Sequence, residues 1–174
     1  TLGACGGIVR NVMACPAPTA DPQQLAVQDF AFQLTRALYP RTSAYHQIWV
    51  DGQELIDDHE VEDPLYGKTF LPRKFKIAIA YAGDNCVDVY TNDVGLVAIF
   101  DENKQLTGFN LLAGGGMGMT HNNDATYSWL ADEIGFVTPE QVIDAVYWIV
   151  TIHRDFGSRE NRKHARLKYI LADH

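Results

Sequence analysis

The chain has 174 residues, of which 47% are hydrophobic and 21% are charged, and its formal net charge is -8. These values are ordinary for a globular protein and supply enough apolar side chains for one sizeable core, so we expect a single domain over 1–174. No apolar run approaches the roughly 18 residues that suggest a membrane span, and we expect a cytoplasmic protein with no membrane partner.

The cysteines Cys5, Cys15 and Cys86 are odd in number and far apart in the sequence. This usage argues against a disulfide framework and suits a reducing compartment. Three thiols are too few for a four-cysteine metal site, so we assign no role to any of them. The chain starts without Met on a glycine-rich stretch, and we expect it to be an excised piece of a longer protein.

The first predicted helix is capped by Asp21 and continues to about Ala37, where "YPR" ends it. A strand follows at "HQIWV" and stops at the turn signal Asp51-Gly52. Acidic residues crowd the stretch 51–63, which we expect to be a solvated loop.

Short runs rich in β-branched and aromatic residues come next, separated by turn signals, and they predict neighbouring strands of one sheet. These runs are Phe75–Tyr81, Val87–Tyr90, Leu96–Phe100 and Gly108–Leu112. A helix capped at Thr138 and running to about Arg154 is apolar nearly all round, which predicts a buried element. A last helix is expected from Ser158 to the chain end. This order predicts an α+β fold, with a mixed, largely antiparallel sheet flanked by helices.

A basic stretch, "FLPRKFKIAIAYA", stands in this acidic chain and runs directly into apolar sequence. Because side chains alternate along a strand, Lys74 and Lys76 share one face with Ala78 and Ala80. Two cations followed by two small side chains leave room for a flat, anionic ligand. An edge strand that lysines protect from further pairing is the alternative, and this pattern alone leaves both open.

Other stretches favour an anionic ligand. The run "LLAGGGMGM" places Gly114, Gly115, Gly116 and Gly118 directly after a strand and permits close approach of the backbone to a ligand, with a bulge or turn as the alternative. It matches neither the dinucleotide fingerprint nor the phosphate-binding P-loop. Arg10 stands alone among small and apolar residues, where an unpaired charge is costly, so we expect it to have an anionic neighbour.

A stripe of cations is predicted on the last helix, because Arg159, Arg162, Lys163 and Arg166 follow the spacing of one helical face. Like charges placed in this way repel each other, so the stripe also favours an anionic partner. A solvated basic face and a nucleic-acid contact are its alternative explanations.

Several long stretches, taken together and in this order, resemble the sirohaem-containing assimilatory sulfite and nitrite reductases, specifically the first sirohaem and iron–sulfur domain of the haemoprotein. These stretches are "GGIVRNVMACPAP", "GKTFLPRKFKIAIAY", "TNDVGLVAI", "GFNLLAGGGMGMTH" and "SRENRKHARLKY". Sulfite-reducing members of that family look like "PRKFK", whereas nitrite-reducing members typically carry Asn at the position of Lys76. The resemblance therefore implies six-electron reduction of sulfite to sulfide, with nitrite reduction as the alternative and a nucleic-acid-binding module as a remote one.

The resemblance also implies roles for single residues. The substrate-binding and proton-supplying residues are expected to be Arg10, Lys74 and Lys76, with Arg73 beside them facing a carboxylate of the sirohaem. The macrocycle is expected to be supported by Gly114, Gly115, Gly116, Arg159 and Arg166.

The family's cofactors are a sirohaem and a [4Fe–4S] cluster, and the cysteine motif that holds the cluster has no match in this chain. We therefore predict no metal ligand here and expect both cofactors only in the full-length protein, with the isolated chain inactive. The expected partners are sulfite, the remaining domains of the same haemoprotein, and an electron donor that is either ferredoxin or a flavoprotein. Nucleic acid is not expected as a partner.

Overall fold

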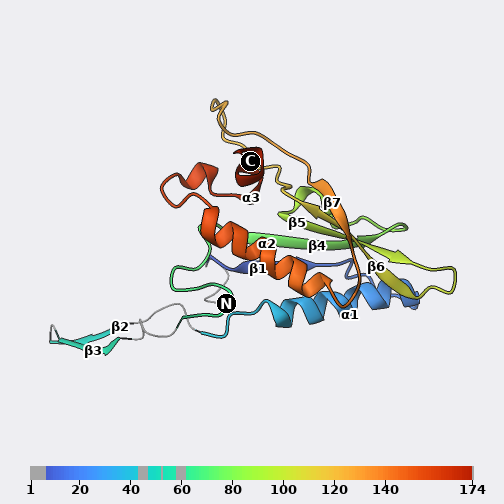
Figure 1. The fold of residues 1–174 in the computed structure, drawn as a ribbon, viewed down its shortest axis with the longest axis horizontal. Helices are drawn as coiled ribbons and strands as arrows, with labels where there is room; N and C mark the ends of the chain where they lie inside the picture. Colours follow the sequence, from blue (N-terminus) through green and yellow to red (C-terminus); the bar gives the residue numbers. More distant parts are fainter. Residues whose placement is uncertain (1–6, 43–46, 52, 58–61, 174) are drawn as a thin grey trace.

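The computed structural model describes residues 7–42, 47–51, 53–57 and 62–173. Two long helices, α1 (Pro22–Ala37) and α2 (Val142–Phe156), lie against a five-stranded sheet, and the short helix α3 (Leu167–Asp173) follows near the C-terminus (Figure 1). The predicted α+β fold, a mixed sheet flanked by helices, is confirmed.

The main sheet has the strand order β1-β4-β5-β6-β7. β1 pairs with β4 in parallel, as does β4 with β5, whereas the β5–β6 and β6–β7 pairs are antiparallel. A separate antiparallel pair is formed by β2 (Gln47–Val50) and β3 (Gln53–Asp57). The strands of the main sheet are β1 (Val9–Met13), β4 (Phe75–Tyr81), β5 (Val94–Phe100), β6 (Leu106–Ala113) and β7 (Asp132–Val137).

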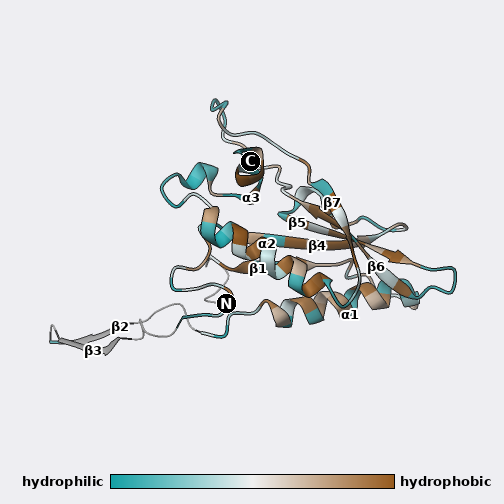
Figure 2. Cartoon of the chain, in the orientation of Figure 1, coloured by the Kyte–Doolittle hydropathy of each residue, from teal (hydrophilic) through white to brown (hydrophobic). Residues whose placement is uncertain are grey.

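The two faces of β4 differ, as the alternating sequence indicates. Phe75, Ile77 and Ile79 are buried in the main core together with residues of α1 and α2. Each such side chain stabilises the fold by about 1.5–3 kcal/mol when fully buried. The opposite face carries Ala78 and Ala80, which belong to a second, smaller cluster. Figure 2 shows β4 as a mostly hydrophobic strand within the sheet.

The cap predicted for the first helix is confirmed. Asp21 accepts a hydrogen bond from the backbone N–H of Gln23 at 3.4 Å, and Pro22 occupies the first helical position. The second carboxylate oxygen of Asp21 accepts from the Tyr81 hydroxyl at 3.1 Å, which ties the start of α1 to the end of β4.

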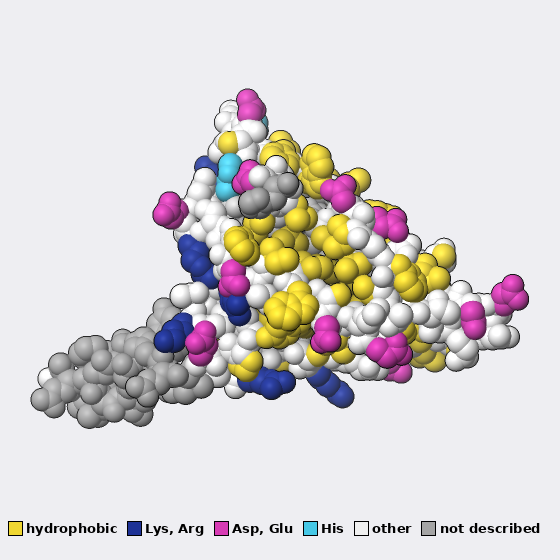
Figure 3. Space-filling view, in the orientation of Figure 1, with side chains coloured by type: hydrophobic (Ala, Val, Ile, Leu, Met, Phe, Trp, Pro, Cys, Tyr) yellow, Lys and Arg dark blue, Asp and Glu magenta, His cyan; other side chains and the backbone are white. Residues whose placement is uncertain are grey.

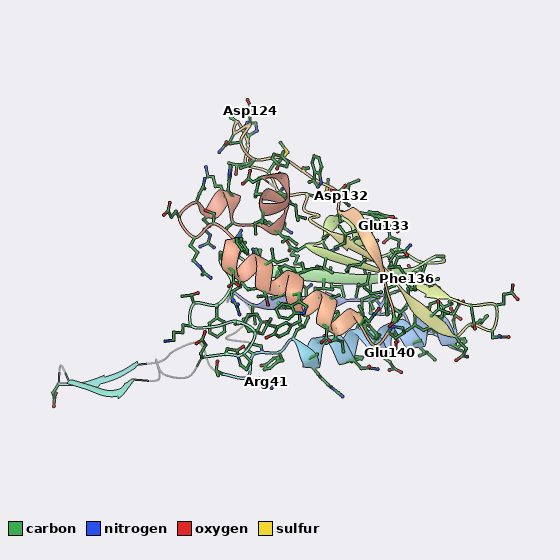
Figure 4. All side chains as sticks on the ribbon, viewed as in Figure 1. Arg41, Asp124, Asp132, Glu133, Phe136 and Glu140 are labelled. Atoms are coloured by element: carbon green, nitrogen blue, oxygen red, sulfur yellow. The ribbon has the colours of Figure 1, made fainter. Side chains whose placement is uncertain are left out.

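The prediction that the helix after Thr138 is buried all round is wrong. α2 begins at Val142 rather than directly after Thr138, and it buries one face through Val142, Val146, Val150 and His153. Trp148 on the opposite face is 63% exposed, and Phe156 at the end of the helix is 68% exposed. Figure 3 shows hydrophobic side chains gathered over this part of the surface. Phe136 of β7, labelled in Figure 4, is also exposed.

Two further predicted elements are wrong. Instead of a strand over Val87–Tyr90 the chain forms a 3-10 turn at Val89–Thr91, because Asp88 adopts a left-handed conformation with φ 50°. The helix expected from Ser158 is replaced by a 3-10 turn at Arg162–His164 and by α3. The side chain of Asn161 accepts from the Lys163 N–H and thereby starts that turn.

The acidic stretch 51–63 is not simply a solvated loop, since it contains β3 and ends on a buried carboxylate; residues 52 and 58–61 lie outside the described part. Asp63 is 2% exposed and accepts four backbone N–H groups, at 2.7–3.1 Å, from Arg41, Thr42, Leu65 and Tyr66. Burial alone would raise the pKa of Asp63, but these hydrogen bonds outweigh it and lower the pKa. Asp63 is therefore a structural acid.

Within the described residues, none of the helices has both the length and the apolar character needed to cross a bilayer.

Candidate functional site

An open pocket of about 810 Å³ lies beside the sheet, and six of its lining residues are cations. Lys76 projects from the face of β4 opposite to Phe75, Ile77 and Ile79, so the pocket lies away from the core beneath α1 and α2. Asp88 is the acid in the lining. The lining cations are Arg73, Lys74, Lys76, Arg162, Lys163 and Arg166. A chain with net charge -8 thus gathers much of its positive charge in one concavity, as expected for a site that binds an anion.

A buried carboxylate that the sequence did not single out organises this pocket. Asp93 is fully buried at the start of β5 and accepts the backbone N–H of Lys76 at 3.0 Å. It also forms an ion pair with Arg166, with Nη2 2.9 Å from Oδ2 and Nε 3.1 Å from Oδ1. Burial raises the pKa of Asp93, and the Arg166 guanidinium acts against that rise. Asp93 therefore fixes both the strand that carries Lys76 and the side chain of Arg166.

The glycine run packs against this arrangement. A Cβ on Gly115 would lie 2.3 Å from the carbonyl oxygen of Tyr90, and one on Gly116 would lie 2.9 Å from the Arg166 guanidinium. Gly114 has φ +87°, a left-handed conformation that favours glycine. Gly118, rather than Gly114–Gly116, lines the pocket. The three glycines thus allow close packing below Arg166, and their expected support of a macrocycle stays a prediction.

Lys168 is a second organising residue that the sequence did not reveal. Its side chain is 2% exposed, and its ammonium group donates to the carbonyls of Gly116 and Gly118 at 3.0 Å each and to that of Tyr127. Burial lowers the pKa of Lys168, with Arg166 adding to the effect. These bonds hold both ends of the loop 117–126, several residues of which line the pocket. Figure 4 labels Asp124 at the tip of this loop.

Arg10 lies beside the pocket rather than in its lining. It occupies a bulge in β1, between the pairs Val9–Phe75 and Asn11–Lys76, and it is exposed. Arg10 is nevertheless the strongest influence on Lys74, whose pKa it lowers, followed by burial and by Arg73 and Lys76. Burial, then Arg162, Arg166 and Arg10, lowers the pKa of Arg73. The four residues predicted to act together therefore share one region of positive potential; they are Arg10, Arg73, Lys74 and Lys76.

Replacing Arg10 by Gln is expected to raise the pKa of Lys74, because the largest repulsive charge acting on its ammonium group is removed. The measurement is the pH dependence of acetylation of Lys74 in the full-length protein, resolved by peptide mass spectrometry. Arg36→Gln, an exposed change at the end of α1, is the control and should leave the Lys74 curve in place. A Lys74 curve that is identical in Arg10→Gln and wild type would contradict the coupling.

Arg159 does not lie in the pocket lining. Its guanidinium donates to the backbone carbonyls of Thr69, Phe70 and Arg154 at 2.6–3.3 Å and so joins the segment before β4 to the end of α2. Arg166, by contrast, lies in the pocket and is paired with Asp93. The predicted helical stripe of cations is wrong, since the residues do not share one helix. The nucleic-acid alternative rested on that stripe.

The family model described as the nitrite and sulphite reductase 4Fe-4S domain matches residues 31–174. The chain belongs to this family. It is 51% identical over 176 residues to the sulfite reductase [NADPH] hemoprotein beta-component of Paenibacillus sp. (strain JDR-2), covering 100% of this chain and 31% of that protein. It is 48% identical over 171 residues to the proteins of the same name from Staphylococcus epidermidis (strain ATCC 12228 / FDA PCI 1200) and Leptospira biflexa (strain Patoc 1 / Ames), covering 98% of this chain and 30% and 31% of theirs.

Among solved structures, the chain is similar to the NirA protein of Mycobacterium tuberculosis, with a TM-score of 0.64 and 25% sequence identity. That similarity covers 98% of this chain and 25% of the NirA chain. The nitrite and sulphite reductase domain described here therefore spans about a third or less of the length of its relatives.

Proteins of this family bind a sirohaem and a [4Fe–4S] cluster. The basic pocket suits the many carboxylates of a sirohaem, because it gathers several cations and the guanidinium of Arg166 is held in place by Asp93 and by the carbonyl of Gly115. The described residues do not fit the [4Fe–4S] cluster in the same way. In the described residues, the one group of metal-ligating side chains consists of Cys15, Asp84 and Cys86, which is not the four-thiolate set that such a cluster takes.

Proposed function

We propose that this chain is the part of a sulfite reductase haemoprotein that binds the sulfite anion and one side of the sirohaem through the basic pocket. The observation that carries the proposal is the convergence of Arg73, Lys74, Lys76 and Arg166 on one concavity. When bound, the sirohaem supplies the iron at which sulfite takes up six electrons and is reduced to sulfide. The parent protein is then an oxidoreductase of the cytoplasm, and the isolated chain is inactive.

Lys74 and Lys76 attract the oxyanion and, with Arg10, compensate its charge. At an effective dielectric constant near 20, a pair of unit charges about 4 Å apart is worth on the order of 4 kcal/mol, and screening by solvent reduces this for half-buried groups. Arg73 and Arg166 face the carboxylates of the macrocycle, since the arginine fork suits carboxylate geometry. The buried Asp93 holds Arg166 in the orientation that this contact needs.

Lys74 also delivers protons, which the conversion of sulfite to sulfide consumes. Its pKa is already lowered by Arg10, burial, Arg73 and Lys76, so its ammonium group gives up a proton more readily than that of an isolated lysine. Lys74 is only half-buried, which lets water recharge the amine. Arg10 thus assists proton transfer at Lys74 as well as binding of the anion.

The remaining domains of the haemoprotein are the partners of the exposed apolar face of this chain. Trp148, Ile152 and Phe156 project from α2, and Ile134 and Phe136 from β7 (Figure 3). The name of the relatives contains NADPH, which points to NADPH as the ultimate source of electrons here as well. Nitrite reduction is the alternative function, favoured if nitrite proves to be the better substrate of the full-length protein.

The test is sulfite reduction by the full-length, cofactor-loaded protein with an artificial electron donor. Lys74→Gln should raise the KM for sulfite about tenfold or more and lower kcat, because a charge worth at least about 1.4 kcal/mol to the anion is lost. Lys104→Gln, which changes an exposed lysine on the β5–β6 turn, is the matched control and should behave like wild type. Unchanged sulfite kinetics in Lys74→Gln would remove this lysine from the site.

A further inference from the structure

A second group of reactive side chains lies outside the basic pocket, at one edge of the sheet. Cys15 follows the end of β1, and Asp84 and Cys86 lie in the loop after β4. Because β1 and β4 are parallel, their carboxyl ends meet at the same edge. The two Sγ atoms and a carboxylate oxygen of Asp84 all lie within 4.8 Å of one another.

The backbone holds each of these residues in place. The loop after β4 is closed by hydrogen bonds between the backbones of Tyr81 and Asp84, at 2.9 and 3.3 Å. Within it, Asp84 Oδ1 accepts the backbone N–H of Cys86 at 2.9 Å. On the other strand, the carbonyl of Cys15 accepts from the side-chain amide of Gln28 on α1 at 2.7 Å. Three potential ligands are therefore presented from two anchored segments.

We propose that Cys15, Asp84 and Cys86 form a binding site for a zinc ion. Zn–S bonds of about 2.3 Å and Zn–O bonds of about 2.0–2.2 Å in tetrahedral geometry place the ligand atoms roughly 3.5–3.8 Å apart. The three atoms lie within 4.8 Å, so a contraction of about 1.3 Å or less completes the coordination. Two thiolates select a soft or borderline metal over magnesium or calcium, which prefer oxygen ligands.

Binding releases the two thiol protons to solvent, so that Zn²⁺ is held by two thiolates and one carboxylate. Cys86 is exposed, which gives the ion a route in and leaves the fourth position to water. A reversible disulfide between the two cysteines is the rival use of this geometry. The two uses differ in their response to zinc and to air, because zinc blocks both thiols whereas a disulfide needs an oxidant.

The zinc ion connects the two strands that frame the basic pocket. Met13, two residues before Cys15, and Val87, directly after Cys86, both line that pocket. A metal that fixes Cys15 to Cys86 therefore fixes one rim of the pocket. The zinc site does not depend on the proposed sulfite chemistry.

The experiment is alkylation of Cys15 and Cys86 by iodoacetamide in the full-length protein, reduced beforehand and kept under argon, with peptide-resolved mass spectrometry. Zinc chloride should slow alkylation of both residues about tenfold or more, whereas magnesium chloride should not. Equal alkylation rates in zinc and magnesium would overturn the proposal. So would a Cys15–Cys86 disulfide that forms under air at the same rate with and without zinc.

Two variants make the result specific. Asp84→Asn removes the carboxylate ligand and should weaken the protection of both cysteines by zinc, whereas Glu102→Gln, an exposed change on the β5–β6 turn, should leave it intact. In a competition with a chromophoric chelator, the wild-type protein should take up one more zinc ion than Cys86→Ser. Equal zinc uptake by these two proteins would also overturn the site. Because the wild-type alkylation needs no variant, a folding defect in Cys86→Ser does not affect the test.

Discussion

Replacing Asp93 by Asn in the full-length protein is expected to raise the KM for sulfite and to lower kcat/KM by roughly a hundredfold, about 2.7 kcal/mol. The carboxylate accepts the backbone N–H of Lys76 and pairs with Arg166, and an amide of the same size lacks the charge and one of the acceptors. Its NH₂ group then faces a donor, and Arg166 loses the anion that orients it.

The measurement combines steady-state kinetics with the content of bound sirohaem. Arg166 is assigned to the macrocycle, so Asp93→Asn should also lower the fraction of protein that retains sirohaem. The variant still contains Lys76. A change in kcat/KM therefore reports on the position of Lys76 and on Arg166, and not on the loss of the lysine.

Asp63 provides the matched control, because it is also a buried carboxylate that accepts backbone N–H groups. It caps the turn that begins at Pro64, and it does not line the basic pocket. Asp63→Asn should lower thermal stability and leave the KM for sulfite of the folded enzyme unchanged. If both variants change only stability, Asp93 is an ordinary structural acid and has no role in positioning.

The strands that the sequence predicted are those with long apolar runs. β4, β5 and β6 lie in the middle of the sheet, and their sequences are mostly apolar. β1 and β7 were not predicted, because they lie at the two edges and their sequences, "VRNVM" and "DEIGFV", interrupt the apolar pattern with charged residues or glycine. The parallel pairing of β4 with β1 and with β5 was not predicted either, since the relative direction of two strands depends on how the chain crosses between them.

The helix pattern gave a wrong prediction where apolar side chains of α2 have no partner among the residues that the structure describes. In α2, Trp148 and Ile152 stand opposite the buried Val146 and Val150, and a sequence does not distinguish a face covered by its own domain from one that the domain leaves open. The prediction of the last helix from Ser158 was wrong for another reason. The cationic spacing from Arg159 to Arg166 suits a helix, but Asn161 caps a 3-10 turn within it.

The sequence predicted those site residues that lie on or beside a strand, because side chains alternate between the two faces of a strand. Lys74 and Lys76 lie in the pocket lining because alternation puts them opposite the core residues Phe75 and Ile77. Asp93 and Lys168 could not be found in this way. Each is a single charged residue whose role comes from tertiary contacts with distant segments, and the only signal was a charge placed within or beside apolar sequence.

Replacing Lys76 by Asn is expected to shift substrate selectivity toward nitrite, lowering the ratio of sulfite to nitrite turnover about tenfold or more, which corresponds to roughly 1.4 kcal/mol. The asparagine side chain can still form hydrogen bonds but has neither the positive charge nor the ammonium protons. Sulfite carries more negative charge than nitrite at neutral pH, so the missing cation weakens its binding more.

The ratio is the informative quantity, because it cancels losses that affect the whole enzyme. Both substrates are measured on the same cofactor-loaded, full-length preparation with one artificial electron donor, and Lys104→Asn serves as the exposed-lysine control. The backbone N–H of residue 76 still donates to Asp93 in the variant, so the strand and the Arg166 pair are preserved. A lysine that only protects a strand edge would change stability by no more than about 0.5 kcal/mol and leave the ratio as it is. An unchanged ratio would therefore remove Lys76 from the substrate site, and it would also remove the main reason to prefer sulfite over nitrite. If the ratio falls while Lys104→Asn matches wild type, the selectivity comes from the charge of the Lys76 side chain.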